Sequence, residues 1–484
     1  MREFDRFYFE WFEFDKNSLK TRFFYSFDKN VKFTEEIDFS SDFLRVRPDF
    51  DEKTLNNFLF SLSLALWISY YKLYPTKELV IKNWFLSDED IVFWQKFYRN
   101  WLWEFLYKNE LSTNWLFNFI NSSEKQYKKI YFKSSENILL PIWWGKDSIV
   151  SAELLLKKDF DFTPIVFWKI DIIKENCLNI MWKDAILIKR KLDENLFKLN
   201  ELGYYNWHVP ITWIISFALL TTAYLYDYKY IILSNEKSAN AWNTTIPCHS
   251  REDGNLLKWK NSFLEINHQY SKSLEFEQDL TNYIDRNLNS DLRYFSLLRG
   301  MYEIKIAEIF SKIWKKYFWV FSSCNRNFKI NKTTTPPTHD VRFPPQLRGI
   351  KGEYNSFWCN SCPKCAFVYA ILRPFITDLE VLQIFGKELY EDKTLENLFL
   401  ELLWIQWIKP FECVGEKEEV IYAMNITLKK FKKEEKQIPY ILLVFEKEVK
   451  NKYDKKFFSD LEQKLFKIYN EETLIPEKFR TLKI

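Results

Sequence analysis

The sequence predicts an α/β fold whose centre is a Rossmann-like parallel sheet with helices on both faces. Two observations predict it. From about residue 136, short apolar runs with strand character alternate with longer segments of helical periodicity. A polar turn, Gly145-Lys146-Asp147-Ser148, joins the first of these strands to the first helix. This alternation favours parallel strands covered on both sides, with ligands bound beyond the carboxyl ends of the strands.

Three regions follow from changes in this pattern. We expect a smaller α+β region over residues 1–130, the sheet domain over residues 131–375 and a mostly helical region over residues 376–484. The first region opens with alternating aromatic and polar residues over residues 1–50, which predicts an antiparallel sheet with a turn near Asp28.

The remaining elements follow from apolar periodicity. Before the sheet domain it predicts two helices, over residues 55–74 and 87–106. In the sheet domain it predicts, in chain order, strand 136–142, helix 148–158, strand 163–170, helices 191–203 and 212–226, and strand 229–234. The segment Asn331–Pro345, rich in threonine and proline, is expected to be an extended loop. In the last region, the apolar run Tyr440–Phe445 is expected to be a strand among helices.

Composition favours a soluble globular protein. The chain has 484 residues, of which 47% are hydrophobic and 28% charged, and its formal charge of +4 argues against a surface that coats nucleic acid. The longest apolar run, Ile211–Tyr226, is shorter than a bilayer span, and Met1–Asp5 lacks the pattern of a signal peptide. We therefore expect a cytoplasmic protein with neither a membrane nor a nucleic acid as partner.

The turn after the first predicted strand has the sequence Pro-Ile-Trp-Trp-Gly-Lys-Asp-Ser over Pro141–Ser148. At such a junction the form Gly-Gly-x-Asp-Ser is typical of loops that bind the pyrophosphate of ATP. Glycine lets backbone N–H groups close around phosphate oxygens, and the helix N-terminus adds a positive field. Ser148 would contact the pyrophosphate, Asp147 would orient Mg²⁺ or a backbone amide, and Lys146 would add positive charge. ATP and Mg²⁺ are therefore expected at this loop.

Trp143 and Trp144 stand where this loop motif has glycine, and two indoles there would fill the volume that the phosphates need. The imbalance extends along the chain, with 8 glycines and 20 tryptophans in 484 residues. An ordinary globular protein has about 7% glycine. We hypothesise that the source reads UGA codons as glycine and that the protein carries glycine at many of these positions. The alternative is a genuinely tryptophan-rich protein, in which the loop is a structural turn.

Two further polar segments resemble parts of a binding site. The first follows the strand predicted over residues 229–234, and the second lies downstream of it. Dense polar residues at a strand end are costly unless they bind something. Lys272 suits the charge that develops on a leaving pyrophosphate, whereas Ser273 has the alternative role of a helix N-cap. The further candidate ATP-binding residues are Asn235, Ser238, Asn240, Ser271 and Ser273.

Four of the seven cysteines predict a metal site. Cys359, Cys362 and Cys365 have the spacing Cys-x₂-Cys-x₂-Cys, and Cys324 supplies a fourth thiol. Four thiolates make a closed tetrahedral Zn²⁺ site, which couples metal binding to the folding of a loop-rich segment. We therefore expect a structural zinc ion. The alternative, a group of reduced buried cysteines, would crowd three sulfur atoms together.

An ordered set of segments resembles one known family when several of the tryptophans are read as glycine. The segments are 206–213, 234–243, 267–277, 294–299, 323–325, 362–365 and 409–415. Together they are similar to the UDP-N-acetyl-α-muramoyl-L-alanyl-L-glutamate epimerases of bacterial peptidoglycan synthesis. The resemblance covers roughly residues 130–425.

The resemblance implies an ATP- and Mg²⁺-dependent isomerase that acts on a small-molecule UDP-muramoyl dipeptide. Its members convert the terminal L-glutamate to D-glutamate and release AMP and pyrophosphate. An α-proton beside a free carboxylate is far too weakly acidic for a side-chain base. Attack of that carboxylate on the α-phosphorus of ATP gives an acyl adenylate, whose carbonyl acidifies the α-carbon until water hydrolyses it. Lys272, the loop and Mg²⁺ would stabilise the developing charge.

The residues that move the proton stay open at this point. His268 has a suitable pKa near neutrality, and Cys413 can act as a thiol acid on the opposite face. Glu236 and Glu412 are further candidates. Arg299 is a candidate partner for a carboxylate or diphosphate of the substrate, with a surface ion pair as the alternative.

Two other functions share parts of the pattern. Another zinc-containing pyrophosphate-loop enzyme, such as a 7-cyano-7-deazaguanine synthase or a tRNA-modifying thiolase, would have the loop and the cysteines but not the segments at 234–243 and 267–277. AMP release that depends on ammonia or tRNA would support it. A non-catalytic relative follows if Trp143 and Trp144 are genuine, and it would not bind ATP.

Overall fold

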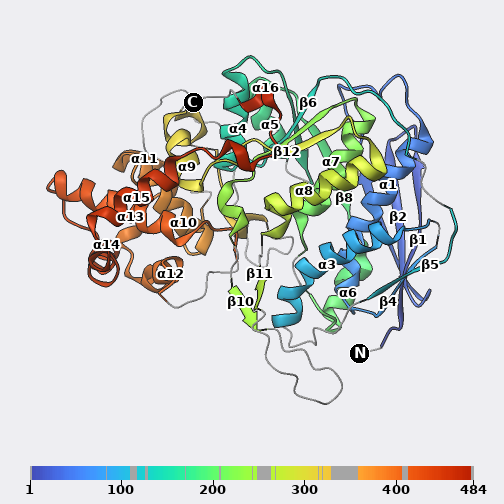
Figure 1. The fold of residues 1–484 in the computed structure, drawn as a ribbon, viewed down its shortest axis with the longest axis horizontal. Coiled ribbons are helices and arrows are strands. Elements are labelled where there is room, and N and C mark those ends of the chain that lie inside the picture. The colour runs from blue at the N-terminus through green and yellow to red at the C-terminus, as the bar shows by residue number, and fades with distance from the viewer. Residues whose placement is uncertain are drawn as a thin grey trace.

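A ten-stranded sheet forms the centre of the molecule (Figure 1). The computed structural model describes residues 3–82, 84–108, 117–125, 129–168, 171–206, 209–241, 244–247, 263–266, 269–313, 315–318, 320–328, 358–405 and 412–480. The strands follow the order β12-β9-β6-β7-β8-β3-β2-β1-β4-β5, and helices cover both faces. The α/β class expected from the sequence is confirmed.

One half of the sheet is parallel. Its strands are β6 (Ile138–Pro141), β7 (Thr163–Phe167), β8 (Ile186–Lys191), β9 (Tyr230–Leu233) and β12 (Arg293–Ser296). All four residues of β6 are buried, as expected for a strand covered on both faces. Successive side chains alternate, so Leu139 packs into one hydrophobic core and Leu140 into the other.

The other half of the sheet begins as the predicted antiparallel meander. It consists of β1 (Arg6–Asp15), β2 (Lys20–Phe27) and β3 (Val31–Asp38), with the turn at Asp28. Two short strands, β4 (Glu78–Ile81) and β5 (Asn118–Asn121), extend it beyond β1 in parallel. β3 pairs antiparallel with β8, so one continuous sheet runs through residues 1–130 and the following region. The domain boundaries stay predictions.

Each face of the sheet has its own hydrophobic core and its own helices. One face carries α1 (Glu52–Leu66), α2 (Ile68–Tyr71), α3 (Asp88–Lys108), α6 (Glu194–Glu201), α7 (Ile211–Leu225) and α8 (Leu274–Tyr283). The other face carries α4 (Lys146–Leu156), α5 (Asp171–Met181) and α9 (Glu303–Lys312). No described helix is both long and apolar enough to cross a membrane.

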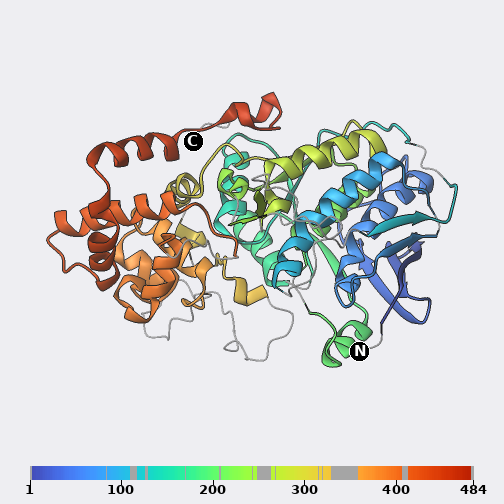
Figure 2. The same ribbon diagram turned by 60° about the horizontal axis from the view of Figure 1, so that its bottom comes forward.

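The C-terminal residues form a helical layer beside α9 (Figures 1 and 2). Its helices are α10 (Pro363–Leu372), α11 (Asp378–Phe385), α12 (Glu396–Leu402), α13 (Lys417–Lys433), α14 (Tyr440–Glu448), α15 (Lys455–Phe466) and α16 (Glu477–Arg480). The last of them returns to the sheet, where Phe479 packs against Tyr230 of β9 and Phe295 of β12. A separate antiparallel pair, β10 (Thr244–Pro247) and β11 (Phe263–Ile266), lies apart from the main sheet.

Two sequence predictions of secondary structure need correction. The strand predicted over Tyr440–Phe445 is wrong, because this segment is the start of α14. Pro439 precedes the helix, and Ile441, Leu442 and Phe445 lie at helical spacing with their side chains buried. The elements α5 and β8, between residues 171 and 191, were not expected. The loop predicted over Asn331–Pro345 lies outside the described residues.

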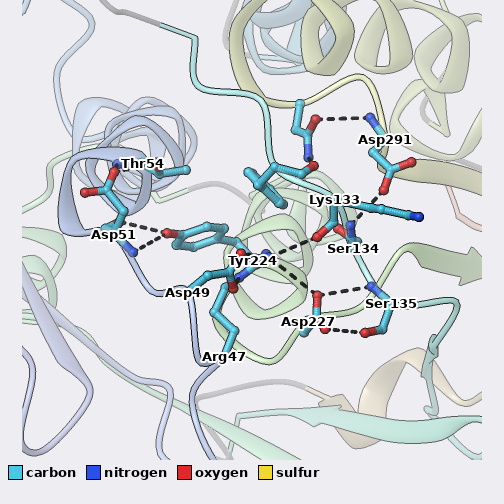
Figure 3. Close-up of polar contacts among 12 residues, drawn as sticks. Arg47, Asp49, Asp51, Thr54, Lys133, Ser134, Ser135, Tyr224, Asp227 and Asp291 are labelled. Carbon is cyan, nitrogen blue, oxygen red and sulfur yellow. Dashed lines mark hydrogen bonds and ion pairs between the residues drawn. The ribbon is translucent and has the colours of Figure 1, made fainter.

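A buried arginine joins the N-terminal half of the chain to the parallel strands (Figure 3). The guanidinium of Arg47 donates to Asp49 and to the carbonyl oxygen of Lys133, and it lies 3.6 Å from Asp227. Its carbon atom Cζ lies over the rings of Phe132 and Tyr224, at 4.5 and 5.2 Å from their centroids. These contacts connect the segment after β3, the turn after α7 and the approach to β6.

We expect Arg47→Ala to lower the free energy of unfolding by about 1–3 kcal/mol, because hydrogen bonds and packing against two rings are lost together. The Arg47 side chain is 1% exposed. Arg22→Ala is the matched control, since the Arg22–Glu13 pair lies in solvent and contributes about 0–1 kcal/mol. Urea unfolding measures both variants, and equal losses would contradict a stabilising role for the Arg47 contacts.

Candidate active site

The loop between β6 and α4 presents a helix N-terminus beyond the end of the strand. α4 begins at Lys146, two residues earlier than predicted, and Gly145 is its N-cap with φ −77° and ψ 158°. The Ser148 hydroxyl donates to the Gly145 carbonyl oxygen at 3.1 Å and accepts from the N–H of Trp143 at 3.4 Å. A Cβ atom on Gly145 would lie 3.1 Å from Ser323 Oγ, so glycine permits this close approach. Free N–H groups at a helix start attract anions.

The two tryptophans of this loop pack into the protein in different ways. Trp144 has a left-handed backbone with φ 54°, and its indole is 3% exposed. The indole N–H donates to the carbonyl oxygen of Ile173 in α5 at 3.1 Å. Trp143 stacks on Phe167 at a centroid distance of 6.0 Å. The expectation that both indoles fill the phosphate volume is therefore wrong for Trp144, whose ring lies in the core against α5.

A buried glutamate connects this loop to the C-terminal helices. Glu303, the first residue of α9, forms ion pairs with Lys146 of the loop and with Lys364 of α10, the latter at 3.2 Å. Lys146 also pairs with Asp147. Burial opposes ionisation of Glu303, but the two ammonium groups outweigh it and hold the pKa of the carboxyl below its usual value. Burial likewise opposes the charge of Lys146, whose pKa the two carboxylates raise.

Glu236 is a carboxyl group of this site that retains a proton more readily than an ordinary glutamate. It lies just after β9 and is 6% exposed. Burial first, and then the negative charges of Glu303 and Asp147, raise the pKa of Glu236, against the opposing effect of Lys272 and Lys364. The carboxyl therefore lies within electrostatic reach of both lysines, as a proton donor or acceptor of the site would.

Lys272 and Cys413, which are 141 residues apart, meet at this site. Lys272 Nζ lies 3.3 Å from Cys413 Sγ. Lys272 ends a short 3₁₀ turn, Tyr270–Lys272, before α8, and Cys413 precedes α13. Burial opposes the lysine charge, but Cys413 and then Glu236 outweigh it and raise the pKa of the ammonium group. A lysine that stays protonated beside a thiol favours the thiolate.

The backbone around Cys413 is held in place by close contacts. The side-chain amide of Gln269 donates to the carbonyl oxygen of Val414 at 3.1 Å. A Cβ atom on Gly415 would lie 2.2 Å from Glu419 Oε2 and 2.6 Å from Phe367 Cζ. Only glycine fits at this position, so the segment that carries the thiol passes directly over α10 and α13.

Three buried side chains of this site were not identified from the sequence. They are Glu303, Lys364 and Glu419. Glu419 accepts from the N–H of Ile304 at 3.0 Å, and burial first, then Glu303 and Glu416, raises its pKa to about 8. Lys364 lies between two of the clustered cysteines, which is the one sequence signal that pointed to it.

The other candidate ATP-binding residues lie near the starts of α8 and α9 or beside Lys272. Asn235 is buried, and its side-chain nitrogen has no hydrogen-bond partner among the described residues. Ser238 Oγ accepts from the first N–H group of α9 at 3.2 Å. Ser273 is the N-cap of α8, and Asn240 Oδ1 also accepts from the start of that helix at 2.8 Å. The helix-cap alternative for Ser273 is thus confirmed, and Ser271 lies half-buried next to Lys272.

Arg299 is completely buried. Its guanidinium forms an ion pair with Glu277, whose side chain is 0% exposed. It also donates to the backbone carbonyl oxygens of Glu236 and Lys272, at 2.7 and 2.6 Å. Arg299 therefore fixes the positions of two candidate catalytic residues, and its contact with substrate stays a prediction. The alternative of a surface ion pair is wrong, because this pair lies in the core.

The four predicted cysteines lie together. Cys324, Cys359, Cys362 and Cys365 bring their sulfur atoms within 4.8 Å of one another. A tetrahedral zinc site with Zn–S bonds of about 2.3 Å spaces its sulfurs by about 3.8 Å, so the described positions fit this metal. The Ser322 N–H, two residues before Cys324, donates to the carbonyl oxygen of Trp144 at 3.0 Å. The cluster therefore lies beside the loop, and the bound metal stays a prediction.

One of the remaining two proton-carrier candidates, His268, lies outside the described residues. Glu412 accepts from the side-chain amide of Asn325 at 3.0 Å, and burial raises the pKa of its carboxyl. The centre that the structure brings together thus contains Glu236, Lys272 and Cys413.

Comparison with known proteins identifies the family. The MurL N-terminal domain matches residues 1–297, and the MurL C-terminal domain matches residues 320–456. A UDP-N-acetyl-alpha-D-muramoyl-L-alanyl-L-glutamate epimerase from Xanthomonas oryzae pv. oryzae is 33% identical over 75% of this chain and 73% of its own. The protein of the same name from Salinispora tropica is 31% identical over 88% of this chain and 85% of its own. No solved structure shows a significant match. The chain belongs to the MurL family.

Proposed function

We propose that this protein epimerises the terminal L-glutamate of UDP-N-acetyl-α-D-muramoyl-L-alanyl-L-glutamate to D-glutamate. The relatives named for this activity match the chain over most of its length. The reaction removes a proton from one face of the α-carbon and returns one to the other face. It therefore needs two proton carriers and a group that stabilises negative charge between the two steps.

The contact between Lys272 Nζ and Cys413 Sγ, at 3.3 Å, carries the proposal. A thiol beside an ammonium group loses its proton more readily, so Cys413 can be one proton carrier. Glu236 has a raised pKa because of burial and neighbouring carboxylates, so it can hold a proton near neutral pH and be the other carrier. Lys272, whose charge both groups sustain, would stabilise the enolate.

Activation by ATP is the step proposed before proton transfer. A carboxylate oxygen of the substrate attacks the α-phosphorus, pyrophosphate leaves, and the resulting acyl adenylate has an acidified α-carbon. After proton exchange, water releases the glutamate carboxylate and AMP. The start of α4, with Lys146 and Ser148, supports a pyrophosphate site there. Asp147, 23% exposed at the first turn, is the carboxylate that would hold Mg²⁺, which supplies charge neutralisation.

A direct assay tests this function. The protein is incubated with UDP-N-acetylmuramoyl-L-alanyl-L-glutamate, ATP and Mg²⁺, and the enantiomers of glutamate are separated after acid hydrolysis. We expect D-glutamate together with AMP and pyrophosphate. Retention of L-glutamate alone, with AMP formed only when ammonia or tRNA is added, would instead favour another pyrophosphate-loop enzyme.

We further propose that the four cysteines bind one structural zinc ion. Cys324→Ser is expected to remove the zinc measured by elemental analysis and to lower the melting temperature, since metal binding contributes folding free energy. Cys177→Ser, a buried cysteine outside the cluster, is the matched control and is expected to retain zinc. Full zinc content in Cys324→Ser would contradict the proposed ligand set.

A further inference from the structure

We infer that Trp144, Trp168, Trp182 and Trp404 are glycines in the protein made by its natural host, which reads UGA codons as glycine. Eleven non-glycine residues of the described part have positive φ, and four are these tryptophans, with φ of 54–70°. Tryptophan makes up 20 of 484 residues, so chance would place fewer than one there. A bulky side chain is an outlier in the left-handed region, whereas glycine occupies it without strain.

The end of α12 shows the glycine requirement most directly. Trp404 lies two residues after this helix, where its N–H donates to the carbonyl oxygen of Glu401 at 2.9 Å. The next N–H, from Ile405, donates to the carbonyl oxygen of Leu400 at 3.1 Å. These two bonds, with residue 404 in the left-handed conformation, form a Schellman motif. The left-handed residue of this motif is usually glycine.

The same motif with a genuine glycine ends α6 of this chain. Gly203 has φ 91°, and its N–H donates to the carbonyl oxygen of Asn200 at 3.1 Å. The following N–H, from Tyr204, donates to the carbonyl oxygen of Leu199 at 3.2 Å. Residue 404 thus has the backbone role that glycine has at residue 203. Trp182 likewise follows the end of α5 with φ 60°, and its side chain is 85% exposed, so no packing explains an indole there.

Buried indoles give a second line of support. The indole N–H groups of Trp168 and Trp213 are buried without a hydrogen-bond partner among the described residues. Such a group costs about 1–3 kcal/mol, and buried tryptophans ordinarily find an acceptor. The ring centroids of Trp213 and Phe97 lie 3.5 Å apart. Ordinary aromatic pairs have a centroid distance of about 4.5–7 Å. The space at residue 213 is therefore too small for an indole, which extends the inference to this position.

Trp67 shows what a genuine tryptophan looks like in the same chain. Its backbone is right-handed with φ −53°, and its side chain is fully buried. Its N–H donates to Tyr98 Oη at 2.6 Å, and its ring packs against Phe7 and Tyr71. The reassignment therefore does not apply to every tryptophan, and the left-handed backbone separates residues 144, 168, 182 and 404 from Trp67.

The consequence for the loop is chemical. Glycine at 144 turns the sequence before Ser148 into Trp-Gly-Gly-Lys-Asp, and residue 144 already has the left-handed backbone that glycine favours. Two consecutive glycines give the loop the backbone freedom with which N–H groups close around phosphate oxygens. This inference goes beyond the proposed function and does not depend on it, because the helix-end positions 182 and 404 lie outside the loop.

Mass spectrometry of the protein from its natural host tests the inference. Trypsin releases Glu175–Lys183, which contains residue 182, and Thr394–Lys417, which contains residue 404 because the Lys409–Pro410 bond resists trypsin. Glycine masses at 182 and 404 are expected. Tryptophan masses at these positions would overturn the inference, whatever the activity of the protein.

A recombinant comparison tests the backbone argument without the host. Trp404→Gly and Trp182→Gly are each expected to raise the melting temperature of the recombinant protein that carries tryptophan at both positions. Each substitution removes the backbone strain of a tryptophan in the left-handed conformation. Trp67→Gly is the matched control and is expected to lower it through a large cavity. If Trp404→Gly and Trp182→Gly instead lower the melting temperature as Trp67→Gly does, the positions are built for tryptophan and the inference fails.

Discussion

We expect Cys413→Ala to abolish epimerisation while AMP and pyrophosphate are still released. This result is expected because the thiol lies 3.3 Å from Lys272 Nζ and would move the α-proton but take no part in attack on ATP. Loss of one general acid–base group costs about 100- to 10,000-fold in rate. Incorporation of deuterium from D₂O into glutamate measures the proton step, and AMP release measures activation. Equal loss of both would place the thiol in activation and contradict its role as proton carrier.

Lys272→Met is the companion variant and is expected to slow both steps, since its charge would serve the enolate and the leaving pyrophosphate alike. Lys237→Met is the matched control. Lys237 begins a different 3₁₀ turn, Lys237–Asn240, where it pairs with Glu472, and its side chain is 15% exposed. Both variants remove one ammonium group, so a difference between them reports the position of the charge. Equal activity of the two variants would contradict a catalytic role for Lys272.

The predictable part of this site is local in sequence. The strand Ile138–Pro141, the turn and the helix after it are consecutive, so apolar periodicity and turn chemistry together identified the loop. The three closely spaced cysteines were identified for the same reason, because they lie on one short turn and the first turn of α10 that follows it.

The partners that complete the site are distant in the chain and were not predictable. Glu303 lies 157 residues from Lys146 and 61 from Lys364, and no motif surrounds it. Its pairing depends on how α9 packs between α4 and α10, which periodicity does not specify. The segment at Tyr440 was mispredicted for a related reason. A six-residue apolar run fits a strand or a buried helix equally well, and packing of the C-terminal layer decides between them.

Glu303→Gln has the largest expected effect on stability. The substitution leaves the ammonium groups of Lys146 and Lys364 buried without the carboxylate that they share. Breaking a buried ion pair from one side costs about 3–5 kcal/mol, because the remaining charge is desolvated and uncompensated. We expect a loss of this size in urea unfolding at pH 7, together with weaker ATP binding as Lys146 loses its anchor. Unchanged stability would mean that water or Asp147 alone neutralises the two lysines.

Glu419→Gln is the matched control, because Glu419 is equally buried near Glu303 but its pKa is raised to about 8. At pH 7 this carboxyl is largely protonated, so its amide replacement costs only about one hydrogen bond, near 1 kcal/mol.

The two variants should also respond to pH in opposite directions. The pKa of Glu303 is lowered in the folded protein, so its stabilisation is present above the ordinary value of 4.5 and is lost as the pH falls through the lowered value. The pKa of Glu419 is raised from 4.5, so its contribution is complete below that value and is lost as the pH rises through about 8. The deficit of Glu303→Gln should therefore shrink in acid, and that of Glu419→Gln in alkali. Parallel pH profiles for the two variants would contradict the charges assigned to Glu303 and Glu419.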